Sequence, residues 1–67
     1  MLSVPIDTGS SVPMYEQIYS FIKNEIKEGR LKEGQKLPSA RSLSTHLTIS
    51  RNTVDMAYSQ LVSEGFL

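Results

Sequence analysis

Apolar residues recur at helical spacing in three stretches of the chain. In the first stretch, Ile18, Ile22 and Ile26 follow one another every four residues, so they share one face of a helix. A proline precedes this stripe and a glycine follows it, where those residues suit the start and the end of a helix. We therefore predict a helix over about residues 13–28. Aromatic side chains near the stripe could stack on bases, but beside three isoleucines we expect them in the core.

The second stretch predicts a shorter helix over about residues 39–47. Leu43 and Leu47 give it an apolar face, and Ser39 is of a residue type that often caps the first turn of a helix. Ser44 falls outside the apolar face at this spacing, so we expect its side chain to point away from the core.

The third stretch predicts a helix over about residues 51–64, which follows the second helix after a tight turn. Val54, Ala57 and Leu61 form its inner face, and Ser50 is the candidate N-cap. The polar residues at its start are then left outside. Two helices joined in this way are typical of a helix-turn-helix, and the expected fold class is mainly α.

The first residues, 1–12, show no helical period and contain proline, glycine and serine, which predicts an extended leader with a turn near Gly9. A helix-turn-helix domain over residues 13–67 would follow it. Within the leader, Asp7-Thr8-Gly9 matches the triplet that carries the catalytic carboxylate of aspartic proteases. That chemistry needs two carboxylates sharing a proton in a β-rich cleft, and this chain lacks the strands to build one. We therefore favour an Asx turn at Asp7.

Length and composition limit the classes of protein to consider. A chain of 67 residues forms one domain at most, and so small a domain buries only about 60% of the surface of its unfolded chain. The absence of cysteine excludes disulfides and thiolate metal sites. The apolar runs are too short for a membrane span and the first residues do not resemble a signal peptide. We therefore expect no membrane association and a cytoplasmic location.

The net charge is zero, which argues weakly against a nucleic-acid partner. The charges are unevenly placed, however, because residues 30–51 hold five of the seven basic side chains and only one acid, Glu33. This segment leads into the helix-turn-helix and would meet a polyanion there, although such blocks are often solvated faces. His46 lies in the same segment with no metal-ligating residue at useful spacing, so we expect a structural histidine.

The candidate chemistry lies at the start of the third helix. In a helix-turn-helix the second helix of the pair enters the major groove, and its first residues contact the bases. An arginine there can pair with guanine and an asparagine with adenine, whereas hydroxyls and free amides at a helix start suit phosphate oxygens. An arginine on the preceding helix and the connector of residues 30–36 can contact the backbone. The candidate DNA-binding residues are Arg41, Ser50, Arg51, Asn52, Thr53, Asp55, Ser59 and Lys36.

Asp55 is an acid on a face that would meet phosphate, which repels it. It lies one helical turn after Arg51, so the two side chains can pair. An acid is tolerable there if it orients Arg51 or accepts a hydrogen bond from a cytosine amine. We expect the orienting role.

Several short motifs together suggest a known family. They are Tyr15-Glu16-Gln17-Ile18, Gly29-Arg30-Leu31, Leu37-Pro38-Ser39, Ser50-Arg51-Asn52-Thr53-Val54, Ala57-Tyr58 and Glu64-Gly65-Phe66-Leu67. With them, residues 13–67 closely resemble the N-terminal winged-helix domain of the GntR family of bacterial transcription regulators. The leader and the Ser-Arg-Asn-Thr-Val motif are most similar to the MocR subfamily, in which this domain is joined to an aminotransferase-like domain that binds pyridoxal phosphate.

The resemblance implies a three-helix winged helix-turn-helix that binds a double-stranded DNA operator as a homodimer. It implies DNA contacts for Arg41 and for the residues from Ser50 to Thr53. It also implies a two-stranded wing after Leu67, so the wing strands are missing or truncated here, and we expect a fragment of a longer protein that binds DNA more weakly than its parent. No cofactor is expected in this chain, because pyridoxal phosphate would belong to the missing C-terminal domain.

Two residues depart from the family pattern. Thr48 stands in the turn where the family commonly has glycine, and a β-branched residue is costly at positive φ, so the turn is expected to be strained or differently shaped. Asp55 stands where some relatives have arginine, which affects the preferred operator sequence.

Two function classes remain. The leading interpretation is a sequence-specific DNA-binding domain of a transcription regulator, and the alternative is a small helical module that binds another protein. An enzyme is not expected, because the chain offers no paired acid and base, metal cluster or phosphate-binding glycine loop.

Overall fold

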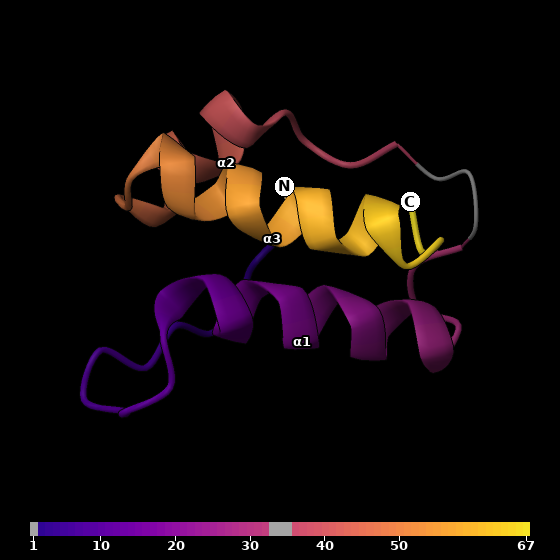
Figure 1. Ribbon diagram of the computed structural model, residues 1–67, viewed down its shortest axis with the longest axis horizontal. Helices are drawn as coiled ribbons and strands as arrows, with labels where there is room; N and C mark the ends of the chain where they lie inside the picture. Colours follow the sequence, from indigo (N-terminus) through magenta and orange to yellow (C-terminus); the bar gives the residue numbers. More distant parts are fainter. Residues whose placement is uncertain (1, 33–35) are drawn as a thin grey trace.

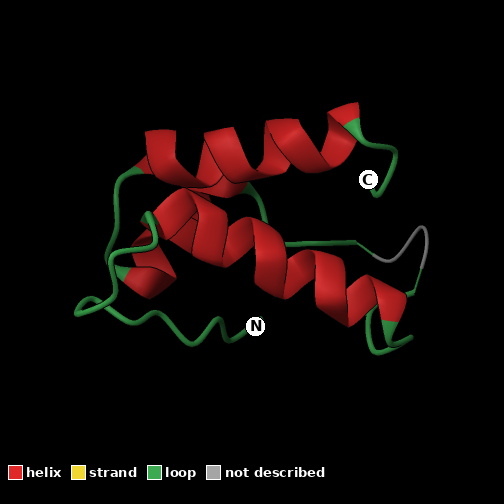
Figure 2. Ribbon diagram, turned by 60° about the horizontal axis from the view of Figure 1, so that its bottom comes forward, coloured by secondary structure: helices red, strands yellow, loops and turns green. Residues whose placement is uncertain are grey.

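The computed structural model describes residues 2–32 and 36–67. They form three helices, α1 (Met14–Lys27), α2 (Ala40–Leu47) and α3 (Arg51–Ser63), and no strand occurs within the described residues (Figures 1 and 2). The chain is therefore mainly α, as its hydrophobic pattern predicts. Each helix begins and ends within two residues of the predicted range. Glu33 and Gly34, which belong to the predicted basic connector, lie outside the described residues.

The core forms where α3 packs against both other helices. α1 and α3 lie side by side and run in the same general direction, and α2 crosses near the start of α3 (Figure 1). The buried stripe of α1 consists of Ile18 and Ile22, which are fully buried, as are Leu43 on α2 and Leu61 on α3. Most of the aromatic side chains near that stripe also pack against the core, as expected, rather than facing solvent as a stacking platform.

Side chains and glycines close the helix ends where the sequence indicates. The Oγ of Ser39 accepts a hydrogen bond from the Ser42 amide at 3.1 Å and so caps α2. Gly29 and Gly65 follow α1 and α3 with φ of 79° and 82°, in the left-handed region that only glycine adopts freely. Pro13 differs slightly from its predicted place, because it is the residue before α1 rather than its first residue.

The leader takes part in the core, which its sequence did not predict. Val4 is buried, and Leu2 and Ile6 pack partly against the same cluster. Alternate residues of an extended segment point to the same side, so this spacing lets one face of the leader cover the helices. The division into leader and domain remains a prediction, but the two share one core.

Gln17 ties the leader to α1. Its Oε1 accepts a hydrogen bond from the Asp7 amide at 2.8 Å, and its Nε2 donates to the carbonyls of Asp7 and Val12 at 3.0 and 2.8 Å. The Oδ1 of Asp7 accepts a hydrogen bond from the Gly9 amide at 3.0 Å. This is the Asx turn that the sequence predicts, so the Asp7 carboxylate has a structural partner rather than a catalytic one.

The prediction for Ser44 was wrong. Its side chain is buried, and its Oγ donates a hydrogen bond to the Arg41 carbonyl at 2.8 Å. A hydroxyl that bonds back to the preceding helical turn needs no solvent partner, so Ser44 can lie inside although it is polar.

Within residues 2–32 and 36–67, no helix has the length and apolarity that crossing a membrane requires.

Candidate nucleic-acid interface

The inner face of α3 fixes which side chains its outer face presents. Val54, Ala57 and Leu61 are all fully buried, as the sequence predicts. Because an α-helix makes one turn every 3.6 residues, the buried inner face leaves Arg51 and Asn52 on the outer face, and both are exposed. The beginning of α3 therefore offers its polar residues to solvent rather than to the protein interior.

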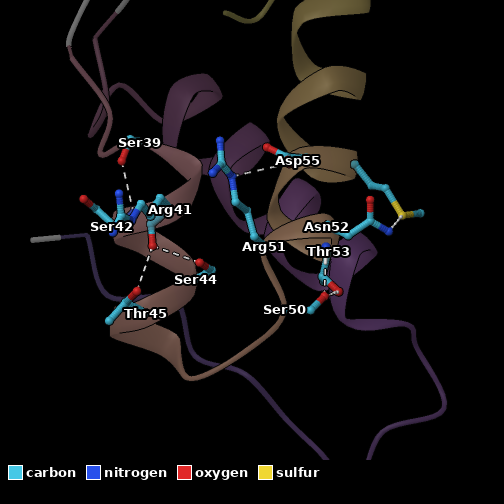
Figure 3. A network of polar contacts seen from close by, with 11 residues as sticks. Ser39, Arg41, Ser42, Ser44, Thr45, Ser50, Arg51, Asn52, Thr53 and Asp55 are labelled. Atoms are coloured by element: carbon cyan, nitrogen blue, oxygen red, sulfur yellow. Dashed lines mark hydrogen bonds and ion pairs between the residues drawn. The ribbon is translucent and has the colours of Figure 1, made fainter.

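Ser50 caps α3 and organises its first turn. The Ser50 Oγ accepts a hydrogen bond from the Thr53 amide at 3.2 Å and lies 2.8 Å from the Thr53 hydroxyl (Figure 3). A helix leaves its first amides without partners inside the helix, and these carry the positive end of the helix dipole. The cap occupies the Thr53 amide, so the amides before it can bind an anion such as phosphate.

Arg51 and Asp55 form an exposed ion pair along α3. The Arg51 Nε lies 3.8 Å from the Asp55 Oδ2, and the side chains are 65% and 51% exposed. Figure 3 shows the end of the guanidinium pointing away from Asp55. A pair this open to water is weak, so Asp55 can orient Arg51 without preventing it from binding a base.

Asn52 has an uncharged partner, a thioether, one turn further along the same helix. Its Nδ2 donates to the Met56 Sδ at 3.7 Å. Sequence reasoning did not include Met56 among the candidates, although its position four residues after Asn52 was a usable signal.

Arg41 lies on the outer face of α2, and its side chain is exposed. Its carbonyl accepts hydrogen bonds from the hydroxyls of Ser44 and Thr45, at 2.8 and 3.0 Å (Figure 3). Beside it is an open hollow of ≈ 540 Å³ lined by Arg41, Ser42, Thr45 and His46. His46 is exposed on this face, and no group of three metal-ligating residues occurs in the described parts of the chain.

The turn between α2 and α3 contains a conformation that threonine rarely adopts. Thr48 has φ 58° and ψ 47° and is the non-glycine residue with positive φ among residues 2–32 and 36–67. Its amide donates to the Thr45 carbonyl at 3.3 Å, and the Ile49 amide donates to the Ser44 carbonyl at 3.0 Å. The turn therefore keeps the left-handed shape that glycine would suit, and Thr48 bears the strain.

The structure does not bring every candidate together. Arg41 is on α2 and the residues from Ser50 to Asp55 are on the adjoining start of α3, whereas Ser59 is exposed about two turns further along α3. Lys36 is exposed ahead of α2. Arg30 of the connector pairs with α1, since its Nε lies 2.7 Å from the Glu25 Oε2, and its contact with phosphate stays a prediction.

The titratable groups with shifted pKa values lie outside the first turn of α3. Hydrogen bonds from Tyr19 and Gln60 lower the pKa of Glu64, and the charge of Lys23 adds to this. The hydrogen bond with Tyr19 raises the pKa of Lys23. Burial raises the pKa of Tyr58, whose hydroxyl donates to the Pro38 carbonyl at 2.8 Å. These groups join segments of the chain to one another, and none of the three is a candidate DNA-binding residue.

Known proteins are similar to this chain in sequence and in the arrangement of their helices. The sequence model for "Bacterial regulatory proteins, gntR family" matches residues 14–67. The solved structure of YtrA from Sulfolobus acidocaldarius, a GntR-family transcription factor, has a TM-score of 0.89 and 46% identity, and the match covers 94% of this chain and 67% of that one.

Two curated relatives are much longer than this chain. The uncharacterized HTH-type transcriptional regulator YhdI of Bacillus subtilis is 45% identical over 92% of this chain. The probable rhizopine catabolism regulatory protein MocR of Rhizobium meliloti is 40% identical over the same share. The chain spans 13% of the length of each.

Proposed function

We propose, from the premise that this chain belongs to the gntR family of bacterial regulatory proteins, that the first turns of α3 enter the major groove of a specific operator. The chain is a DNA-binding domain of the kind found in transcription regulators, not an enzyme, and such a domain itself needs no cofactor.

One observation carries it: the outer face at the start of α3 has a donor-rich pair of side chains, Arg51 and Asn52, above a fully buried inner face. Their side chains can make bidentate contacts with guanine and adenine. Their partners, Asp55 and Met56, lie on the same helix, so neither has to leave a contact with another segment in order to bind DNA.

Phosphate contacts would surround these base contacts. Ser50 and Thr53 present hydroxyls beside the positive end of α3. Arg41 adds an exposed positive charge from α2, Lys36 adds another from the connector, and Ser59 extends the polar face of α3. If several of these contacts neutralise phosphates, affinity falls steeply as salt rises.

The deciding experiment compares Arg51→Ala with Arg30→Ala. Duplexes are first selected from a random pool by the wild-type chain, and affinities are then measured at several salt concentrations. Arg51→Ala should weaken binding by about 1–3 kcal/mol and relax the preference at one position. Arg30→Ala removes an equal charge, which pairs with Glu25 near the C-terminal end of α1, so it should leave that base preference intact.

Equal losses in the two variants would overturn base recognition by Arg51. If the wild-type chain enriched no duplex but bound a protein, the alternative of a protein-interaction module would replace DNA binding. In the same assay Asp55→Ala should relax base preference, because Arg51 loses its orienting carboxylate. A rise in affinity that is equal for all sequences would instead assign Asp55 a purely repulsive effect.

We further propose that the full-length protein is a cytoplasmic homodimer of the MocR type. The similarity to MocR supports this, but YtrA shares the same domain, so this chain's sequence is compatible with more than one subfamily. The proposal implies a pyridoxal phosphate domain in the rest of the protein. The absorbance of bound pyridoxal phosphate in the purified full-length protein tests the subfamily, and its mass in solution tests the dimer.

A further inference from the structure

The outer face of α3 carries two side-chain pairs that are parallel to each other. Arg51 contacts Asp55 at 3.8 Å, and Asn52 contacts Met56 at 3.7 Å, each across four residues. The first pair is an ion pair, whereas the second joins an amide to a thioether. The proposed function gives Met56 no role, although it is as close to Asn52 as Asp55 is to Arg51.

Met56 is an apolar residue in a polar setting. It is 45% exposed, and the other exposed large apolar side chains within the described residues are Val12, Val62 and Leu67. Met56 alone among these lies one helical turn from a candidate base-binding residue, since i and i+4 share a face. Val62 is on the same helix, but near its C-terminal end.

We propose that Met56 is a specificity-determining residue, whose thioether and methyl group contact the C5-methyl of a thymine while its sulfur orients the Asn52 amide toward an adenine. The proposal rests on the proposed function, because it requires α3 to lie in the major groove. Thymine is recognised there by apolar contact with its methyl group, and methionine is a flexible, polarizable side chain that fits such irregular surfaces.

The Asn52 amide can keep its sulfur contact while it binds adenine. Its nitrogen carries two hydrogens, so one can point to the Met56 Sδ and the other to the adenine N7, while the Oδ1 accepts from the N6 amine. Sulfur is a weak acceptor, so it orients the amide without withholding it from the base.

Helix geometry limits where the thymine can be. Four residues of α-helix advance about 6 Å, and base pairs are about 3.4 Å apart along the duplex axis. The thymine that Met56 contacts should therefore lie within about two base pairs of the adenine that Asn52 binds.

The test uses the duplex that the wild-type chain itself selects from a random pool. Each thymine is replaced in turn by uracil, which lacks only the C5-methyl, and each adenine by 7-deazaadenine, which lacks N7. For wild type, one uracil substitution should lower affinity about fourfold, the effect of uncovering one methyl group. It should lie within about two base pairs of a position that is sensitive to 7-deazaadenine.

Three variants separate a contact from a general effect. Met56→Gln keeps the length of the side chain but makes it polar, so it should abolish the difference between thymine and uracil. Met56→Leu stays apolar and should retain most of that difference. Val62→Gln is the matched control, because it makes the same kind of change at an exposed site near the other end of α3, and it should behave as wild type.

Two results would overturn the inference while leaving the proposed function standing. One is a selected duplex in which no uracil substitution matters. The other is a Met56→Gln variant whose affinities for the thymine and uracil duplexes differ by the same factor as in wild type, even if both affinities are lower. Failure of the wild-type chain to enrich any duplex would overturn the proposed function itself and the inference with it. Circular dichroism verifies that each variant keeps its helices.

Discussion

The two ends of α3 use polar side chains in different ways. At the N-terminal end, the side chains of Arg51 and Asn52 have their partners among the described residues one turn further along the same helix. At the C-terminal end, Glu64 accepts hydrogen bonds from Tyr19 of α1 and, at 3.1 Å, from Gln60, and it lies 3.9 Å from the Lys23 Nζ. The first end has local pairs, whereas the second has contacts between helices.

This difference separates recognition from folding within one short helix. A side chain whose partner is on the same helix can exchange that partner for a bound molecule without moving another segment, which suits a binding surface. A side chain that joins two helices contributes to their arrangement. Lys23 illustrates the second case, because its Nζ lies 5.3 Å from the ring centres of both Tyr19 and Phe66 and so connects α1 with the residues after α3.

The largest effect should come from removing the apolar contact beneath the C-terminal end. Leu61 is fully buried, so Leu61→Ala should lower the free energy of unfolding by about 2–5 kcal/mol through lost burial and a cavity. For so small a domain this is a large part of the total stability. Urea unfolding followed by circular dichroism measures it.

Ser59→Ala is the control for that change. Ser59 is exposed on the same helix, so its replacement should alter the free energy of unfolding by no more than about 0.5 kcal/mol. Similar losses in the two variants would mean that the outer face of α3 also supports the fold, and the proposed separation of the two ends would be wrong.

An intermediate effect should follow from Ser50→Ala at the N-terminal end. Loss of this cap should reduce stability by about 1 kcal/mol, and DNA affinity should fall as well, because the hydroxyl is a candidate phosphate ligand. Ser39→Ala removes the corresponding cap of α2, with nearly the same geometry. Both variants should unfold at lower urea concentration, but only Ser50→Ala should bind DNA more weakly than its loss of folded protein explains.

Much of this arrangement could be predicted from sequence because it depends on local rules. The spacing of Val54, Ala57 and Leu61 gave the inner face of α3, and the serine caps and terminal glycines marked the ends of the helices. The unusual backbone of Thr48 was also foreseeable, since the residue stands in a turn that glycine suits. These features need only the periodicity and conformational preferences of neighbouring residues.

The remaining features depend on residues that are distant in sequence. The contact of Tyr19 with Glu64 spans 45 positions, and nothing in either neighbourhood indicates it. The burial of Val4 requires the leader to return to the helices, and Gln17 holds it there from ten positions away.

The smallest effect should come from Glu64→Gln, and pH makes it visible. The folded-state pKa of Glu64 is lowered, chiefly by the hydrogen bond from Tyr19, so its carboxylate stabilises the fold above the unfolded-state value of 4.5. That stability is lost as pH falls through the folded-state pKa. Unfolding curves of wild type and Glu64→Gln should therefore differ most near neutral pH and converge in acid. The raised pKa of Lys23 keeps the lysine charged throughout this range, since its contribution fades only as pH rises above 10.5.

If the free energies of unfolding of wild type and Glu64→Gln differed by the same amount from neutral pH into acid, the carboxylate charge would add nothing to the contact between α1 and the end of α3. DNA affinity is the second readout of the same variant. At 0.15 M salt the screening length is about 8 Å, so a charge at the C-terminal end should hardly affect a duplex bound at the N-terminal end. Asp55→Asn removes an equal charge beside Arg51 and should change binding. If Glu64→Gln changed binding as much as Asp55→Asn, the DNA would have to extend along the whole of α3, and its two ends would no longer be functionally distinct.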